Sequence, residues 1–106
     1  MTSKKPAQQK RANLPRSSDR TKQFVKDWER LSHSGRYDMR RLKEAMLLII
    51  ANDAPLPPEY LDHELTAESK GFRECHIGGD FLLIYDLLED GAVVFTRAGT
   101  HADLFK

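Results

Sequence analysis

The fold is decided by residues 71–99, which read GFRECHIGGDFLLIYDLLEDGAVVFTRAG. Three segments of strand character, residues 71–77, 81–88 and 92–99, are separated by Gly78-Gly79-Asp80 and by Glu89-Asp90-Gly91. Connections this short join antiparallel neighbours. The stretch therefore predicts a β-meander of three strands.

Two helices are expected before the meander. Ser18 or Asp19 is expected to cap the first, which stops at Gly35, and the second is expected from about Asp38 to Asn52 with an aliphatic face for the core. A short strand near residues 12–16, a proline-rich loop over residues 53–65 and a single helical turn in the tail complete the expected elements. This order predicts an α+β fold, with two N-terminal helices packed on a small, mainly antiparallel sheet.

The charge is unevenly distributed along the chain. Residues 1–22 hold seven basic residues and one acid, for a net charge of +6, whereas the remainder holds 10 basic and 15 acidic residues, for −5. We expect residues 1–17 to form a flexible basic arm and residues 18–106 to form one domain. Such an arm is common in proteins that touch nucleic acid, but it also fits a tail that only aids solubility.

Composition favours a cytoplasmic protein without a membrane partner. The longest apolar run, residues 45–51, is seven residues long, whereas a spanning helix needs about 20. The first residues lack the apolar core of a secretory signal. A single cysteine, Cys75, forms no internal disulfide, which agrees with a reducing compartment.

Polar side chains are expected to converge at one edge of the sheet. The antiparallel order places the end at His76 and Asp80 beside the end at Arg97, with His101 just beyond and His63 in the preceding loop. Imidazoles, a carboxylate and a guanidinium, with no conspicuous serine or cysteine nucleophile, suit RNA cleavage, in which the 2′-hydroxyl is itself the nucleophile.

Each candidate also has a plainer interpretation. Phe81 and Phe105 fit base stacking, but Phe105 also fits a hydrophobic plug over the sheet. Arg97 also fits a cross-strand pair with Glu74 or Asp86. The spacing of the histidines matches no compact zinc motif, so we expect no metal and no other cofactor.

The order of the motifs resembles the YafQ-like branch of the RelE superfamily, bacterial toxins of type II toxin-antitoxin modules that cut mRNA on the ribosome. The resemblance is carried by LPPEYLDHEL (residues 56–65), GFRECHIGGDFLLIYDL (residues 71–87) and RAGTHADLF (residues 97–105), and it covers roughly residues 18–105. Phe81 stands where the family pattern often has tryptophan, and Gly78-Gly79 makes the turn before Asp80 looser than a proline-containing version.

The resemblance implies a site, a substrate and a partner. It assigns catalytic roles to His63, His76, Asp80, His101 and Phe105. Our hypothesis for these roles makes His101 the general acid, His63 or Asp80 the general base, and His76 and Arg97 the groups that stabilise negative charge. We also expect Arg97, Phe81 and Arg73 to bind phosphate or RNA. It implies a RelE-like fold for residues 18–106, a ribosome-dependent endoribonuclease acting on translated mRNA without a metal, and inhibition by a cognate antitoxin. The alternative is a non-catalytic RNA- or ribosome-binding module that uses the basic arm.

Overall fold

The structure, a computed structural model, describes residues 13–65 and 71–105. Its elements in chain order are β1 (Ser18–Arg20), α2 (Lys22–Ser34), α3 (Met39–Ala51), the 3-10 helix η1 (Pro58–Tyr60), β2 (His63–Glu64), β3 (Phe72–Gly78), β4 (Phe81–Leu87), β5 (Val93–Gly99) and α4 (His101–Leu104). The α+β class is confirmed, as are the meander β3-β4-β5 and the terminal helical turn α4.

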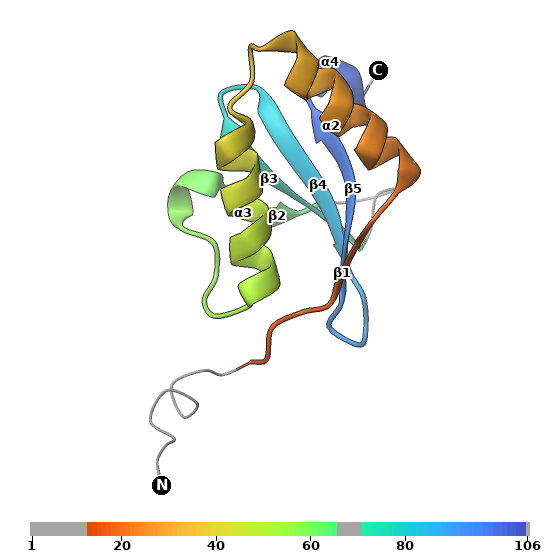
Figure 1. Cartoon of the computed structure of the whole chain (residues 1–106). Coiled ribbons are helices and arrows are strands. Elements are labelled where there is room, and N and C mark those ends of the chain that lie inside the picture. The colour runs from red at the N-terminus through yellow and green to blue at the C-terminus, as the bar shows by residue number, and fades with distance from the viewer. Residues whose placement is uncertain (1–12, 66–70, 106) are drawn as a thin grey trace, which may run out of the picture.

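The strands form one sheet in the order β1-β5-β4-β3-β2. All neighbours are antiparallel except β1 and β5, which are parallel, with Asp19 opposite Val94. The last strand, β5, therefore lies inside the sheet, between the first strand and β4 (Figure 1).

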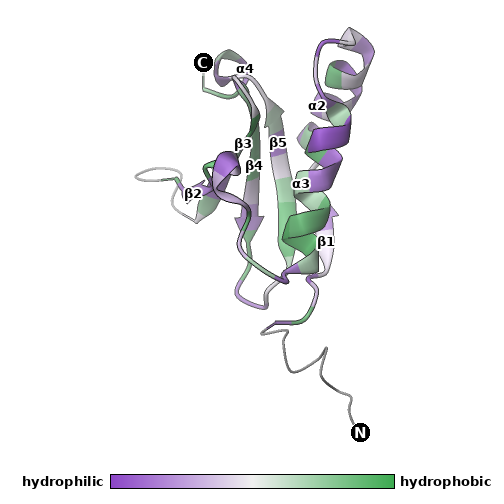
Figure 2. Cartoon of the chain, turned by 90° about the vertical axis from the view of Figure 1, so that its left-hand side faces the viewer, coloured by the Kyte–Doolittle hydropathy of each residue, from purple (hydrophilic) through white to green (hydrophobic). Residues whose placement is uncertain are grey.

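Helices α2 and α3 cover one face of the sheet (Figures 1 and 2). The core lies between these two layers because side chains alternate along a strand and only one set faces the helices. Its buried members include Phe24, Leu31, Leu42, Ala45, Ile49, Cys75, Ile77, Leu83 and Phe95. Phe24 of α2 packs directly on Phe95 of β5, with ring centroids 5.9 Å apart.

The expected limits of the helices are confirmed at three of four ends. Asp38 caps α3 by accepting a hydrogen bond from Arg41 N at 3.0 Å, and Gly35 and Asn52 end the helices with left-handed backbones. The expected cap at Ser18 or Asp19 is wrong: Thr21 caps α2, and its side chain accepts from Phe24 N at 2.9 Å. The helix starts later because the three residues before Thr21 are held extended against β5.

Two short strands depart from the sequence expectations. The strand expected near residues 12–16 is wrong for residues 13–16, which are irregular, and the strand lies at Ser18–Arg20 instead. The segment expected to be only a loop contains η1 and also β2, which pairs with β3. Within the described residues, no helix has the length and apolar character needed to cross a membrane.

Most of the predicted basic arm lies outside the described residues, so its flexibility stays a prediction. Its last part contacts the domain: Arg16 donates to the carbonyl of Gly91 at 2.7 Å and to the side chain of Asn52 at 3.0 Å. Its backbone N–H also donates to the carbonyl of Ile50 at 2.8 Å. These contacts connect the segment before β1 with the C-terminal end of α3 and with the β4–β5 turn.

Candidate active site

Three histidines and a phenylalanine form a row of rings along the sheet. His63 lies 6.4 Å from His76, His76 lies 6.3 Å from His101, and Phe105 lies 5.9 Å from His101, measured between ring centroids. We call His63, His76 and His101 the histidine row. Four of the expected catalytic residues are thus brought together from β2, β3 and the C-terminal segment.

Strand register explains why the row forms. Leu82 of β4 lies opposite His76 on one side and opposite Gly99 on the other, so His76 and the end of β5 are level across the sheet. His101 follows Gly99 by two residues and starts α4. Cys75 and Ile77 belong to the core, so His76, between them, faces away from the helix layer.

Asp80, the fifth expected catalytic residue, is bound to His101. Its carboxylate contacts His101 Nδ1 and also accepts the His101 backbone N–H at 3.2 Å. These hydrogen bonds from the His101 side chain and backbone lower the pKa of Asp80. Asp80 therefore stays ionised and, by accepting at Nδ1, leaves His101 Nε2 as the nitrogen available to a substrate.

The helical turn that carries His101 is fixed by Asp103. Its side chain accepts the Thr100 backbone N–H at 3.0 Å, and its backbone N–H donates to the Thr100 hydroxyl at 3.2 Å, which forms a capping box. Arg30 of α2 donates to the same carboxylate at 3.3 Å. Glycine at position 99 provides the space for the Asp103 side chain, since a Cβ there would lie 2.8 Å from Asp103 Oδ2.

Glu74 joins the site, although the sequence suggested it only as a pairing partner for Arg97. It is 5% exposed, and its Oε1 lies 3.3 Å from His63 Nε2 and 3.8 Å from His76 Nε2. The signal was present in the alternation of β3, because residues 74 and 76 share a strand face. The sequence contains no clear signal for strand β2, which pairs with β3 and places His63 opposite Glu74.

Arg97 is not brought to the histidine row. Its Nε donates to Asp27 Oδ2 at 2.8 Å and its Nη2 to Asp27 Oδ1 at 3.3 Å, so the guanidinium faces α2. The expected alternative partners, Glu74 and Asp86, are not the ones it uses. Asp27 is 1% exposed and also accepts the Ala98 N–H at 3.0 Å. Burial alone would raise the pKa of Asp27, but these hydrogen bonds outweigh it and lower that pKa, while Asp27 raises the pKa of Arg97.

Arg73 and Phe81, expected to bind RNA, are also held elsewhere. Arg73 donates to Asp62 Oδ2 at 2.8 Å, and Tyr85 donates to the other oxygen of Asp62. Phe81 is only 5% exposed, because Tyr37 packs on it with ring centroids 5.0 Å apart. A buried ring offers no face to a base, so the expected stacking role of Phe81 does not fit its position.

Within residues 13–65 and 71–105, no group of three or more His, Cys, Asp or Glu side chains is arranged to hold a metal ion. Cys75 is fully buried, and burial raises the pKa of its thiol to about 12. A thiol in this state is a poor ligand and a poor nucleophile, since both roles need the thiolate. The groups that the histidine row presents are imidazoles, with the carboxylates of Glu74 and Asp80 beside them.

Comparisons with known proteins place the chain in a family. Residues 16–106 match the family model described as "Bacterial toxin of type II toxin-antitoxin system, YafQ". The mRNA interferase toxin YafQ of Escherichia coli (strain B / BL21-DE3) is 42% identical over 92 residues, which are 87% of this chain and 98% of the relative. These matches agree with the resemblance read from the sequence motifs.

Solved structures of similar proteins share the fold. The toxin in a crystal structure of the E. coli DinJ-YafQ toxin-antitoxin complex has a TM-score of 0.77 at 41% identity, covering 88% of this chain and all of that chain. A metal-bound toxin from Helicobacter pylori has a TM-score of 0.72 at 35% identity, covering 84% of this chain and 98% of that chain. The expected RelE-like α+β fold is confirmed. The chain belongs to the YafQ family of bacterial toxins from type II toxin-antitoxin systems.

Proposed function

We propose that this chain is a ribosome-dependent endoribonuclease that cuts translated mRNA in the cytoplasm and is inhibited by a cognate antitoxin. One observation carries the proposal: two outer histidines of an exposed row each have a carboxylate beside them, with a third histidine between. Paired imidazoles of this kind supply the base and the acid that 2′-hydroxyl attack needs. The 42% identical relative is named an mRNA interferase, which supports the same activity here.

His63 is the proposed general base. Its Nδ1 contacts the carbonyl of Leu61 at 2.8 Å, so in the neutral ring Nδ1 carries the proton and Nε2 keeps its lone pair. Nε2 takes the proton of the 2′-hydroxyl, and the 2′-oxygen attacks phosphorus. Glu74 Oε1 lies 3.3 Å from the same nitrogen, so its negative charge stabilises the imidazolium that forms when Nε2 takes the proton.

His101 is the proposed general acid. The acid is the imidazolium form: its Nδ1–H donates to Asp80, and its Nε2–H gives its proton to the 5′-oxygen as the bond from phosphorus to that oxygen breaks. The products are a 2′,3′-cyclic phosphate and a 5′-hydroxyl, which balances protons and charge. Because Asp80 is bound to His101, it acts as a positioning residue, and the base role falls to His63.

His76 and Phe105 complete the proposed site. His76 lies between the acid and the base, where its ring faces the negative charge that develops on the phosphorane. Phe105 is 47% exposed at the His101 end of the row, and an exposed ring there stacks on a base. Arg97 and Arg73 act through structure in this proposal, since each is paired with a carboxylate away from the row.

The test is primer extension on translated messages, with ribosomes and without them. Cleavage that needs ribosomes, survives a chelator and is abolished by a 2′-deoxynucleotide 5′ of the cut supports the proposal. Growth arrest that persists in His63 and His101 variants would instead indicate a non-catalytic binding module. Loss of activity in chelator would indicate a metal-dependent hydrolase.

The antitoxin partner is proposed from relatives. Solved complexes pair YafQ of E. coli with DinJ, and we expect a small, partly acidic protein encoded upstream to bind this chain in the same manner. Co-expression with that reading frame should relieve growth arrest and yield a complex that elutes as one species. Arrest that persists, with the two proteins eluting apart, would reject that partner.

A further inference from the structure

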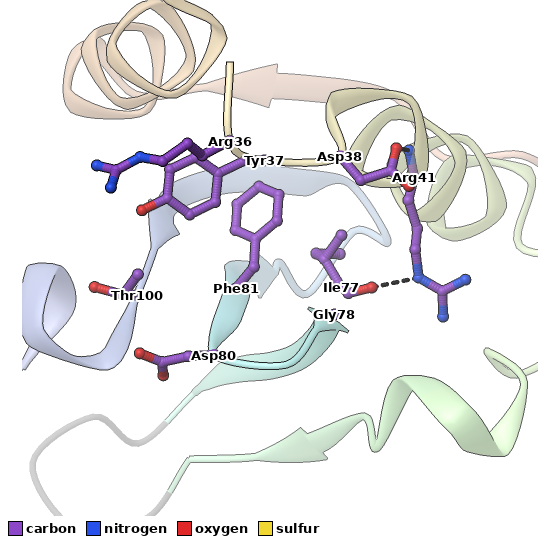
Figure 3. A pocket seen from close by; sticks show the side chains of 9 residues that line it. All are labelled: Arg36, Tyr37, Asp38, Arg41, Ile77, Gly78, Asp80, Phe81 and Thr100. Carbon is purple, nitrogen blue, oxygen red and sulfur yellow. Dashed lines mark hydrogen bonds between the residues drawn. The ribbon is translucent and has the colours of Figure 1, made fainter. Parts of the chain in front are cut away.

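A hollow of about 430 Å³ lies beside the histidine row, on the other side of Asp80. It is bounded by the connection between α2 and α3 and by the turn between β3 and β4 (Figure 3). Asp80 and Thr100 stand near one end, and Arg41 stands at the other. We call it the arginine groove, after its lining residues Arg36 and Arg41. Its size falls within the range of about 300–1,000 Å³ that is usual for small-molecule sites.

The positive charge of the groove is well placed for a phosphate. Arg41 donates through Nε to the carbonyl of Ile77, and its guanidinium lies 4.8 Å from the ring centroid of Tyr60. These two contacts fix the side chain while its outer nitrogens turn away from Ile77 (Figure 3). Arg36, on the α2–α3 connection, is exposed. A fixed guanidinium and an exposed one suit a phosphodiester backbone.

The acidic groups of the groove are already engaged. Asp38 caps α3 by accepting from Arg41 N at 3.0 Å. Asp80 accepts from both the ring and the backbone of His101. With both carboxylates bonded within the protein, the two guanidinium groups are the charged donors that the groove offers to a ligand.

Tyr37 supplies an aromatic surface between the two arginines. Its ring rests on buried Phe81 at 5.0 Å and 56°, and Tyr37 itself is half-buried. Phe81 lies beside Tyr37, on the side toward Ile77, and supports the Tyr37 ring, which lines the groove (Figure 3). An aromatic side chain between cationic groups is the combination that binds single-stranded RNA, in which a base stacks while the backbone is neutralised.

Resting on the proposed function, we propose that the arginine groove binds the ribonucleotide on the 3′ side of the cleaved bond, with Tyr37 stacking on its base, Arg36 contacting the next phosphate and Arg41 contacting the backbone at the other end of the groove. The polarity follows from the mechanism. The general acid His101 protonates the 5′-oxygen, which belongs to the downstream nucleotide. That nucleotide therefore leaves the histidine row at His101, and the groove begins at Asp80, which is bonded to His101.

The test uses ribosomes programmed with a message that the wild-type protein cuts, measured at single turnover. Tyr37→Ala should slow cleavage between about 5-fold and 150-fold, the range for loss of one stacked base, whereas Tyr37→Phe should retain the rate. Arg36→Ala should raise the ribosome concentration that gives half-maximal cleavage by about tenfold. Arg40→Ala is the matched control, because Arg40 is an exposed arginine on α3 that does not line the groove.

An abasic nucleotide locates the contact. Placed 3′ of the cut, it should slow the wild type as much as Tyr37→Ala does, and the two changes together should slow cleavage no further. Placed 5′ of the cut, it should add its full effect to that of Tyr37→Ala. Thermal unfolding of each variant distinguishes a lost contact from a lost fold.

Two outcomes distinguish a failure of this inference from a failure of the proposed function. If the wild type cuts the message while Tyr37→Ala and Arg36→Ala behave like Arg40→Ala, the groove does not bind RNA and the endoribonuclease assignment stands. If the wild type leaves programmed messages intact, the endoribonuclease assignment fails and the groove's role fails with it.

Discussion

Replacing Asp27 with alanine tests how the end of β5 is held to the helix layer. Leaving the buried Ala98 N–H without its acceptor costs about 1–3 kcal/mol. Arg97 and Arg30 also lose a partner, but their side chains are 31% and 46% exposed, so water replaces much of that loss. The total loss of stability should lie at or below the roughly 3–5 kcal/mol that follows removal of one partner from a fully buried ion pair. We expect Asp27→Ala to lower the free energy of unfolding by about 3 kcal/mol, which corresponds to roughly 12–24 °C in melting temperature.

The measurement is urea unfolding followed by the fluorescence of Trp28, the single tryptophan, on α2. Glu29→Ala is the control, because Glu29 is exposed on the same helix and its loss should change stability by less than about 0.5 kcal/mol. If Asp27→Ala unfolds with the same free energy as Glu29→Ala, the bonds to Arg97 and Ala98 do not hold the layers together.

Acid should reduce the difference in the free energy of unfolding between the wild type and Asp27→Ala. The pKa of Asp27 is lowered in the folded state, so its contribution is fully present above the unfolded pKa of about 3.9 and is lost as pH falls through the lower folded value. The stability gap should therefore be constant from pH 8 to 5 and shrink below about pH 4. A gap that stays constant to pH 2 would contradict the lowered pKa.

Three further predictions concern the site and its support. His101→Gln should reduce single-turnover cleavage by about two orders of magnitude or more with its melting temperature retained, and full activity in that variant would remove His101 from the mechanism. Gly99→Ala should reduce cleavage by about tenfold or more, because a Cβ would meet Asp103 at 2.8 Å and displace α4. Primer extension measures this loss directly. The thiol of Cys75, with a pKa of about 12, should react with iodoacetamide only after unfolding, and rapid alkylation of the native protein would show that the thiol is accessible.

The sequence was sufficient for the meander and most helix ends, because their signals are local. Gly78-Gly79 and Asp90-Gly91 mark turns, and Asp38 and Gly35 are a cap and a stop with a direct physical basis. The strand β1 was misplaced because its three residues are all exposed and polar, without the alternation that marks a strand. Its stability comes from β5, more than 70 residues later.

The site was predicted where residues lie close in sequence or across a meander, and missed where the partner is distant. His76, Asp80 and His101 follow from antiparallel register alone. Arg97 was assigned to the site because nothing near it in sequence indicates Asp27, which lies 70 positions earlier. Phe81 was expected to stack on a base, and the uniformly apolar stretch FLLIY does not reveal that Tyr37 covers its ring.

Because β5 lies inside the sheet, a growing chain can complete the sheet only after its last strand has been synthesised. A nascent polypeptide that stops before residue 93 leaves β1 and β4 with unfilled edges and has no His101. Synthesis must pass Gly99 to complete the sheet, His101 to complete the histidine row and Phe105 to add the ring beside it. Fragments that end before residue 93 lack both the interior strand and His101, so we expect them to have no cleavage activity.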